Sequence, residues 1–259
     1  MKSVFGGFNG EIMRRWVNLL AILTAFLMNV YANIAPPNGV TIGQIANTTF
    51  RDVLFIPANY AFSIWGLIYL GLIAFGVYQV LPAQQNNSLL FRGGYLIAIA
   101  SVAQIAWVFL FQYGFFTLSV PAMLVILGCL IGLYKTLKIG KERVGNKQKW
   151  LVYNPISIYL GWISVATIVN VASALYAAGW NGWGIAPQVW TIIMLVVATI
   201  LGGFVTFKRK DIVFNLVFVW AFVGIAVRQM AMMPVALTAV GLAVVLVLLG
   251  LWCCFGNRK

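Results

Sequence analysis

The sequence has 259 residues, of which 63% are hydrophobic and only 8% carry a charged side chain. Its mean hydropathy is +0.97. Soluble domains are about 25% charged and about 45–50% apolar. The composition therefore excludes a soluble enzyme, a disordered chain and a secreted disulfide-rich protein. We predict an all-α, multi-pass integral membrane protein.

Eight apolar stretches have the length of about 20 residues that a membrane-spanning helix needs. Each stretch is a continuous apolar run, whereas a barrel strand alternates between apolar and polar residues. The expected helices are 16–34, 58–81, 93–115, 118–138, 153–178, 187–207, 211–229 and 233–255.

The net charge of +13 would favour a nucleic-acid partner in a soluble protein, but here the basic residues fall between the apolar stretches. Fifteen of the 17 lie on one side of an eight-helix chain: Lys2, Arg14, Arg15, Arg92, Lys135, Lys138, Lys141, Arg143, Lys147, Lys149, Lys208, Arg209, Lys210, Arg258 and Lys259. Arg51 and Arg228 fall on the other side. Since basic loops stay inside, we predict both termini inside and no nucleic-acid partner. The expected location is a bacterial inner membrane, with a thylakoid membrane as the alternative.

The chemistry available for catalysis is narrow. The chain has no histidine and four acidic residues, which are Glu11, Asp52, Glu142 and Asp211. A histidine base, a histidine-containing triad and a histidine haem ligand are therefore excluded. The three cysteines and four acids show no metal-ligand spacing. We predict neither catalytic nor metal-binding residues, and the scarcity of acids inside the apolar stretches disfavours proton- or sodium-coupled transport.

Residues 35–57, between the first two expected helices, form the longest connection. Long loops are often lids or disordered segments. The many apolar residues in this one, such as Phe50, Phe55 and Ile56, argue against disorder. We predict a lid over the outer mouth of the bundle.

Six of the ten tryptophans stand at expected helix ends, where indoles form an aromatic belt. Trp65, Trp107, Trp162 and Trp220 stand deeper. They either pack in the bundle or stack on a planar ligand, and both interpretations stay open. Small residues on the fifth expected helix likewise either bring helices close together or leave room for a flat apolar ligand.

Three segments carry a family pattern. They are Pro57 to Trp65 followed by Tyr69, Gln104 to Trp107 followed by Phe111, and Asn154 to Asn170. With the long segment after the first helix, they resemble the TspO/translocator-protein family, also called tryptophan-rich sensory proteins. The most specific match is Trp162 eight residues before Asn170, with Ala166-Thr167 between them. Ser63, Tyr60 and Gln104 stand where the family has Pro, Trp and Asn.

The resemblance implies a five-helix core at 1–183 with the lid at 35–57, to which 184–259 adds three helices in the same bundle. It implies a tetrapyrrole such as protoporphyrin, or a sterol-like molecule, bound between the helices for sensing, sequestration or handling, with no obligatory cofactor. Light-dependent porphyrin breakdown is the one enzymatic activity that it suggests, at positions that match Trp65 and Trp162. The residues expected at the site are Trp65, Tyr69, Gln104, Trp107, Trp162, Ala166, Thr167 and Asn170.

Two other functions remain open. One is an uncoupled transporter or exporter of a lipid or a small apolar metabolite. The other is a structural subunit of a larger membrane complex. The expected partners are membrane lipid, the apolar ligand, and a second copy of the chain or a larger complex.

Overall fold

The computed structural model describes residues 2–255, with side chains from residue 10 onward. Three of the basic residues predicted to lie on the inner side are outside this part: Arg258, Lys259 and the side chain of Lys2. The described residues form helices and connections without a β-strand, so the all-α prediction is confirmed. The long helices are α1 (Lys2–Ile34), α3 (Ile64–Val80), α5 (Leu96–Gln112), α6 (Phe116–Thr136), α8 (Asn154–Ala177), α9 (Pro187–Arg209), α10 (Ile212–Arg228) and α11 (Met233–Phe255).

Short helical turns connect them. They are α2 (Ile42–Asn47), α4 (Ser88–Phe91) and α7 (Asn146–Gln148), the 3-10 turns η1 (Asn59–Ser63), η2 (Pro82–Gln84) and η4 (Gly182–Gly184), and the π-helical turn η3 (Lys149–Tyr153). With η1 joined to α3, each of the eight expected stretches corresponds to one helical segment.

Within the described residues, six helical segments are long and apolar enough to cross a membrane. The other two, α5 and α10, are apolar but have 17 residues each. At 1.5 Å per residue they extend about 26 Å, slightly less than a hydrocarbon core of about 30 Å. The chain is thus a polytopic helical bundle. Which membrane face holds the termini stays a prediction.

The first helix begins earlier than the predicted residue 16. Its candidate membrane span is Gly10–Ile34. Glu11 and Arg14, three residues apart on the helix, form an ion pair of 2.6 Å that supports this first part. The prediction located the apolar run, whereas the helix also includes the polar residues before it.

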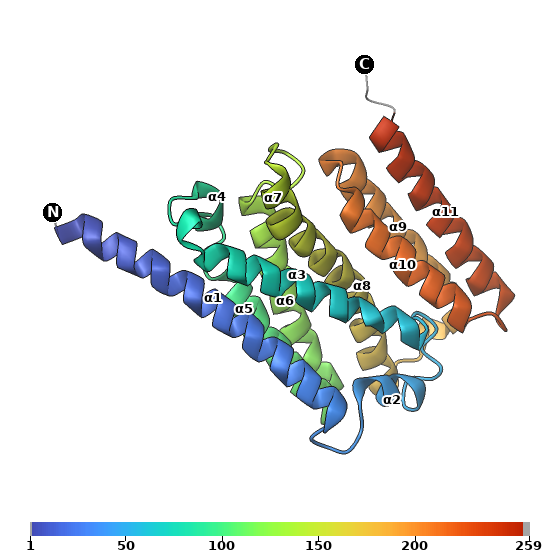
Figure 1. Ribbon diagram of the computed structural model, residues 1–259. Helices are drawn as coiled ribbons and strands as arrows, with labels where there is room; N and C mark the ends of the chain where they lie inside the picture. The colour runs from blue at the N-terminus through green and yellow to red at the C-terminus, as the bar shows by residue number, and fades with distance from the viewer. Residues whose placement is uncertain (1, 256–259) are drawn as a thin grey trace.

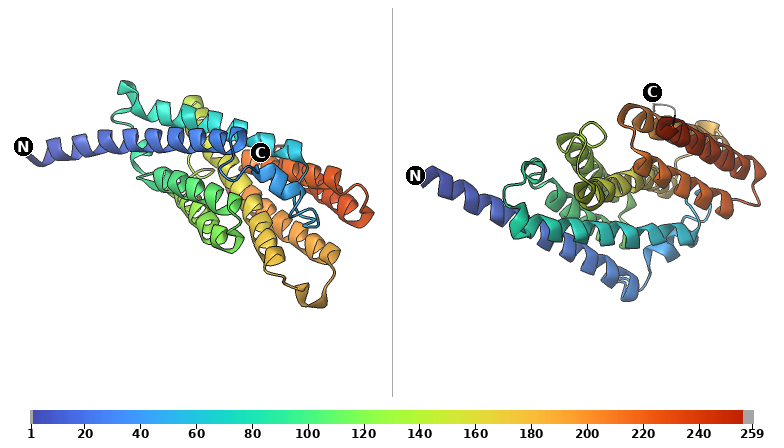
Figure 2. Two further views of the ribbon diagram at one scale, coloured as in Figure 1. Left: turned by 90° about the horizontal axis from the view of Figure 1, so that it is seen from below. Right: turned by 45° about the horizontal axis from the view of Figure 1, so that its top comes forward.

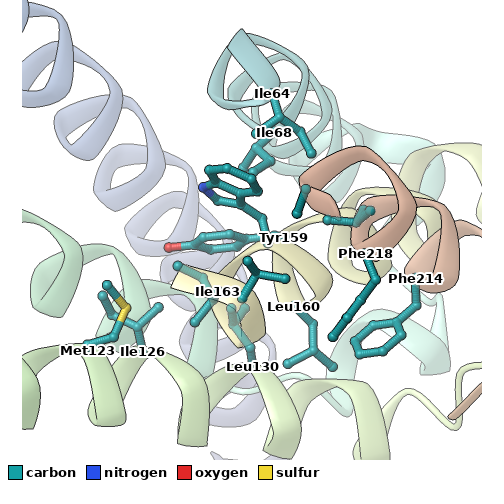
Figure 3. Close-up of a cluster of buried hydrophobic side chains, with 14 of the residues drawn as sticks. Ile64, Ile68, Met123, Ile126, Leu130, Tyr159, Leu160, Ile163, Phe214 and Phe218 are labelled. Carbon is teal, nitrogen blue, oxygen red and sulfur yellow. The ribbon is translucent and has the colours of Figure 1, made fainter. Parts of the chain in front are cut away.

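Helix α8 is the centre of the packing. It contacts α3, α6 and α10. Figure 1 shows α3 crossing in front of α8, with α9, α10 and α11 grouped at one edge of the bundle, and the turned views of Figure 2 keep this grouping. In the core, side chains of α3, α6 and α10 converge on Tyr159, Leu160 and Ile163 of α8 (Figure 3). The division into a core and an extension stays a prediction, although the three C-terminal helices contact the other five mainly through α10.

Two contacts bring α10 close to α8. A Cβ atom at Gly161 would lie 3.0 Å from Cβ of Val217, so any other residue there would push α10 away from α8 by a few tenths of an ångström. At the start of α10, the buried Asp211 carboxylate accepts hydrogen bonds from the hydroxyls of Tyr134 (2.9 Å) and Ser157 (2.6 Å). Asp211 also caps α10 by accepting from the backbone N–H of Phe214 at 3.0 Å. One carboxylate therefore joins α6, α8 and α10.

Candidate functional site

An apolar pocket lies between α3, α5 and α8, beneath the segment 35–57, which we call the lid segment. Its volume is about 50 Å³. Its lining residues are Ile42, Ala46, Ile56 and Pro57 of the lid segment, Phe62, Trp65, Trp107 and Phe111, and Trp162, Val165, Ala166, Val169, Asn170 and Ser173 of α8. The pocket is thus surrounded by aromatic and aliphatic side chains, with few polar atoms.

The pocket face of α8 follows from helical spacing. Trp162, Ala166, Asn170 and Ser173 are separated by four, four and three residues, which places them along one side of the helix. Gly161 points elsewhere and packs on α10. The small residues of α8 therefore have both of the roles that the sequence left open. Gly161 allows close packing against α10, and Ala166 lies beside the free space of the pocket.

Five of the eight residues expected at the site line this pocket. Three of them are the tryptophans Trp65, Trp107 and Trp162, which come from α3, α5 and α8. The other two are Ala166 and Asn170 on α8. The structure thus brings together side chains from three helices, the most distant of which, Trp65 and Asn170, are 105 residues apart in the chain.

The other three expected residues lie outside the lining. Tyr69 is buried and stacks on Trp65, with ring centroids 5.6 Å apart, so it supports that indole from the next turn of α3. Gln104 accepts a hydrogen bond of 3.3 Å from the hydroxyl of Tyr159. Thr167 donates to the carbonyl of Ile163 in its own helix at 2.7 Å. None of these three side chains lines the space.

Asn170 uses its side chain within the protein. Its Oδ1 accepts a hydrogen bond from Nε1 of Trp107, and its Nδ2 donates to Oγ of Ser119 at 2.9 Å. Ser119 donates in turn to the carbonyl of Phe116 at 2.6 Å. This network fixes α5, α6 and α8 relative to one another at the pocket wall.

Two polar atoms of lining residues have no such partner. Nε1 of Trp162 and Oγ of Ser173 are buried, and neither finds a hydrogen bond among the described residues. Leaving a buried polar group unpaired costs about 1–3 kcal/mol. Ser173 was not predicted, because its only sequence signal is its position three residues after Asn170 on the same face of α8.

The lid segment is attached on both sides of the pocket. On the α5 side, Gln112 Nε2 donates to the carbonyl of Val40 in the lid segment at 3.4 Å and to the carbonyl of Ala32, near the end of α1, at 2.8 Å. Phe50 is fully buried, and its ring lies edge-on to Phe116 at 4.7 Å. The expectation that the apolar residues of this segment pack instead of being disordered agrees with their burial.

On the other side, α10 holds the lid segment. Arg228 donates to Oδ1 of Asn47 and to the carbonyl of Ala46, both at 2.9 Å. Gln229 Nε2 donates to the carbonyl of Leu54 at 3.0 Å. The pocket-lining residue Ala46 is therefore fixed by a side chain from the C-terminal part of the chain.

A carboxylate or thiolate metal site is not formed in the described part of the chain, where no three Cys, Asp or Glu side chains gather. The polar groups of the pocket lining that remain without a hydrogen bond in the described structure are the Trp162 indole N–H and the Ser173 hydroxyl.

The comparisons with known proteins give one match. A search of curated proteins and a search of solved structures each found no match. A family model described as TSPO-like protein matches residues 15–252, a range that includes the three C-terminal helices. With its apolar helical bundle, the chain is therefore a multi-pass integral membrane protein that belongs to the TSPO-like family.

Proposed function

We propose that this protein binds a planar apolar ligand, a tetrapyrrole such as protoporphyrin, in the pocket under the lid segment, and that it senses, sequesters or hands on that ligand. The observation that carries the proposal is the meeting of three indoles, from α3, α5 and α8, around one apolar space. Aromatic rings stack on planar ligands, and each favourable pair contributes about 0.5–1.5 kcal/mol beyond the burial of apolar area.

The two unpaired polar atoms support the same assignment. Pockets for small molecules combine apolar walls with a few polar groups that orient the ligand. The indole N–H of Trp162 can only donate, so it favours a ligand with a hydrogen-bond acceptor. Ser173 lies 11 residues further along α8, about 16 Å at 1.5 Å per residue. A carboxylated tetrapyrrole offers acceptors at both its ring and its periphery.

The pocket must expand to admit such a ligand. Its volume of about 50 Å³ is well below the roughly 300–1,000 Å³ of typical ligand pockets. The lid segment is the connection that covers this space, and a few hydrogen bonds hold it to Gln112 of α5 and to Arg228 and Gln229 at the end of α10. The proposed binding cycle therefore includes release of the lid segment, binding of the ligand and return of the lid segment.

A titration of purified protein with protoporphyrin tests the proposal. The shift of the porphyrin absorbance band gives the affinity, and tryptophan quenching gives an independent measure. We expect the Trp65→Phe/Trp162→Phe variant to bind about tenfold more weakly than wild type, a loss of about 1.4 kcal/mol.

The matched control is Trp150→Phe/Trp252→Phe, which also removes two indoles, but from exposed positions away from the pocket. This control should bind like wild type. If both double variants bind protoporphyrin alike, the site assignment is wrong. A flux measurement in proteoliposomes then separates binding from transport, since a transporter moves ligand across the bilayer and a binder does not.

A further inference from the structure

A second, larger groove lies outside the pocket, on the side of the bundle where α10 meets α3 and α8. Its volume is about 380 Å³. It is lined by Ser63, Ile64, Leu67, Ile158, Val213, Leu216, Val217 and Trp220. None of these residues lines the pocket under the lid segment. The two spaces lie on different sides of α3, because Ile64 lines the groove and its neighbour Trp65 lines the pocket.

The groove is formed by helix packing. Helices α3 and α10 both contact α8, and α10 also contacts η1, the turn that precedes α3. Gly161 holds α10 against α8, as described above. Toward the lid segment, Trp220 Nε1 donates to the carbonyl of Ala61 at 2.9 Å, and its ring lies edge-on to Tyr60 at 5.4 Å. The indole therefore closes one end of the groove.

The groove has the apolar walls that a hydrocarbon chain requires. Leu67 and Leu216 are more than half exposed, and Trp220 is 37% exposed. In a multi-pass membrane protein such a surface faces the bilayer. Val213 and Trp220 are seven positions apart on α10, about 10 Å at 1.5 Å per residue. This is roughly a third of a hydrocarbon core of about 30 Å.

The end of the groove opposite Trp220 carries positive charge. Val213, in the first turn of α10, stands three residues after Lys210, the C-cap residue of α9; Lys208 lies in the last turn of α9, and both lysines are exposed. Arg209 is not available to a ligand in the same way, because it donates to the carbonyl of Ile139 at 3.2 Å and lies over the ring of Tyr134. Two exposed lysines that precede the groove residue Val213 by five and three residues complement a phosphate whose acyl chain lies in the groove.

We propose that this groove binds one acyl chain of an anionic phospholipid, whose phosphate lies at Lys208 and Lys210. The site is independent of the proposed pocket function, since the two share no lining residue. It uses the C-terminal helices, which supply one wall and both lysines.

Native mass spectrometry of delipidated protein tests this site. The protein is titrated with phosphatidylglycerol and with phosphatidylcholine of the same acyl chains. We expect wild type to bind one phosphatidylglycerol roughly tenfold more tightly than phosphatidylcholine. Lys208→Gln/Lys210→Gln should lose this preference and keep the weaker binding. The control Lys141→Gln/Lys147→Gln removes the same charge elsewhere and should keep the preference.

Substitutions that fill the groove test whether an acyl chain binds in it. Leu216→Trp and Leu67→Trp place bulk into it from opposite walls, and both should lose both lipids while binding protoporphyrin like wild type. Leu248→Trp, on the exposed face of α11, is the control. If the two filled variants bind lipid like this control, or if wild type binds the two lipids equally, the proposal is overturned.

Discussion

The indole N–H of Trp107 donates a hydrogen bond to Oδ1 of Asn170, which joins α5 to α8 at the wall of the pocket. The same amide donates to Ser119 of α6, so three helices meet at one side chain. Trp107 also stacks on Phe111, with ring centroids 5.3 Å apart. These contacts fix the indole plane, so Asn170 positions the aromatic wall and has little hydrogen-bonding capacity left for a ligand.

Replacing Asn170 should therefore destabilise the protein. Asn170→Leu keeps the size of the side chain but leaves the Trp107 indole N–H unpaired, which costs about 1–3 kcal/mol. We expect a lower thermal unfolding midpoint in detergent. Thr167→Val is the control on the same helix, because the Thr167 hydroxyl donates to the backbone carbonyl of Ile163 and joins no other helix. Equal midpoints for the two variants would contradict the positioning role.

Ser173 should behave in the opposite way. Its buried hydroxyl has no partner in the described structure, so Ser173→Ala should leave the unfolding midpoint unchanged or raise it. If the hydroxyl meets the ligand, the same change should weaken protoporphyrin binding by about fivefold, or about 1 kcal/mol. Ser164→Ala on the same helix removes a hydroxyl that bonds only to Leu160 and should not change the affinity. A Ser173→Ala variant with wild-type affinity would remove Ser173 from the site.

The helices could be predicted because each apolar run is long and continuous, and polar residues separate it from the next run. The pocket face of α8 was also within reach, since Trp162, Ala166 and Asn170 follow helical spacing. The directions in which the side chains of Tyr69 and Thr167 point could not be predicted from the sequence. Tyr69 stands one turn after Trp65, yet it packs behind the indole, because α1 offers the backbone carbonyl of Ala25 at 3.4 Å from its hydroxyl. That choice depends on a helix far away in the sequence.

The groove and the attachment of the lid segment were beyond sequence reasoning for the same reason. Trp220 reaches the carbonyl of Ala61, 159 residues away. Arg228 reaches Asn47 across 181 residues. Periodicity reports which face of a helix is apolar, but it does not report which helix covers that face.

The hydrogen bonds of Asp211, which connect α6, α8 and α10, should contribute to the stability of the protein. Asp211→Ala removes the cap of α10 and leaves the hydroxyls of Tyr134 and Ser157 without their acceptor. From typical values for a cap and for hydrogen bonds to a charged group, the loss should be about 2–4 kcal/mol. Asp52→Ala is the control, since Asp52 is exposed and accepts one long hydrogen bond from Tyr176. Similar unfolding midpoints for the two variants would refute this role.

A pH-dependent contact lies in the loop after α6. Hydrogen bonds from Lys138 and Arg92 lower the pKa of Glu142 from its ordinary value of 4.5. Because the folded-state pKa is the lower one, the stabilising effect is present above pH 4.5 and is lost as the pH falls through the folded-state pKa. The effect should be small, since exposed ion pairs are weak. The thermal unfolding midpoint of Glu142→Gln, measured against pH, should fall less than that of wild type as the pH drops below 4.5. If the two midpoints depend on pH in the same way, the contact does not contribute to stability.

Arg228 should control access to the pocket. Its guanidinium donates to Asn47 and to the carbonyl of Ala46, a pocket-lining residue. Arg228→Gln shortens the side chain and removes both hydrogen bonds, which favours release of the lid segment. Hydrogen bonds to charged groups contribute about 1.5–3 kcal/mol, so the open population should rise by about tenfold or more. Protoporphyrin association and dissociation, followed by stopped-flow fluorescence, should both accelerate, and the equilibrium affinity should change less than either rate. Arg51→Gln removes an exposed arginine of the lid segment itself and should leave both rates unchanged. If the Arg228 variant associates and dissociates like the Arg51 variant, the lid segment does not limit access, and the ligand reaches the indoles by another path.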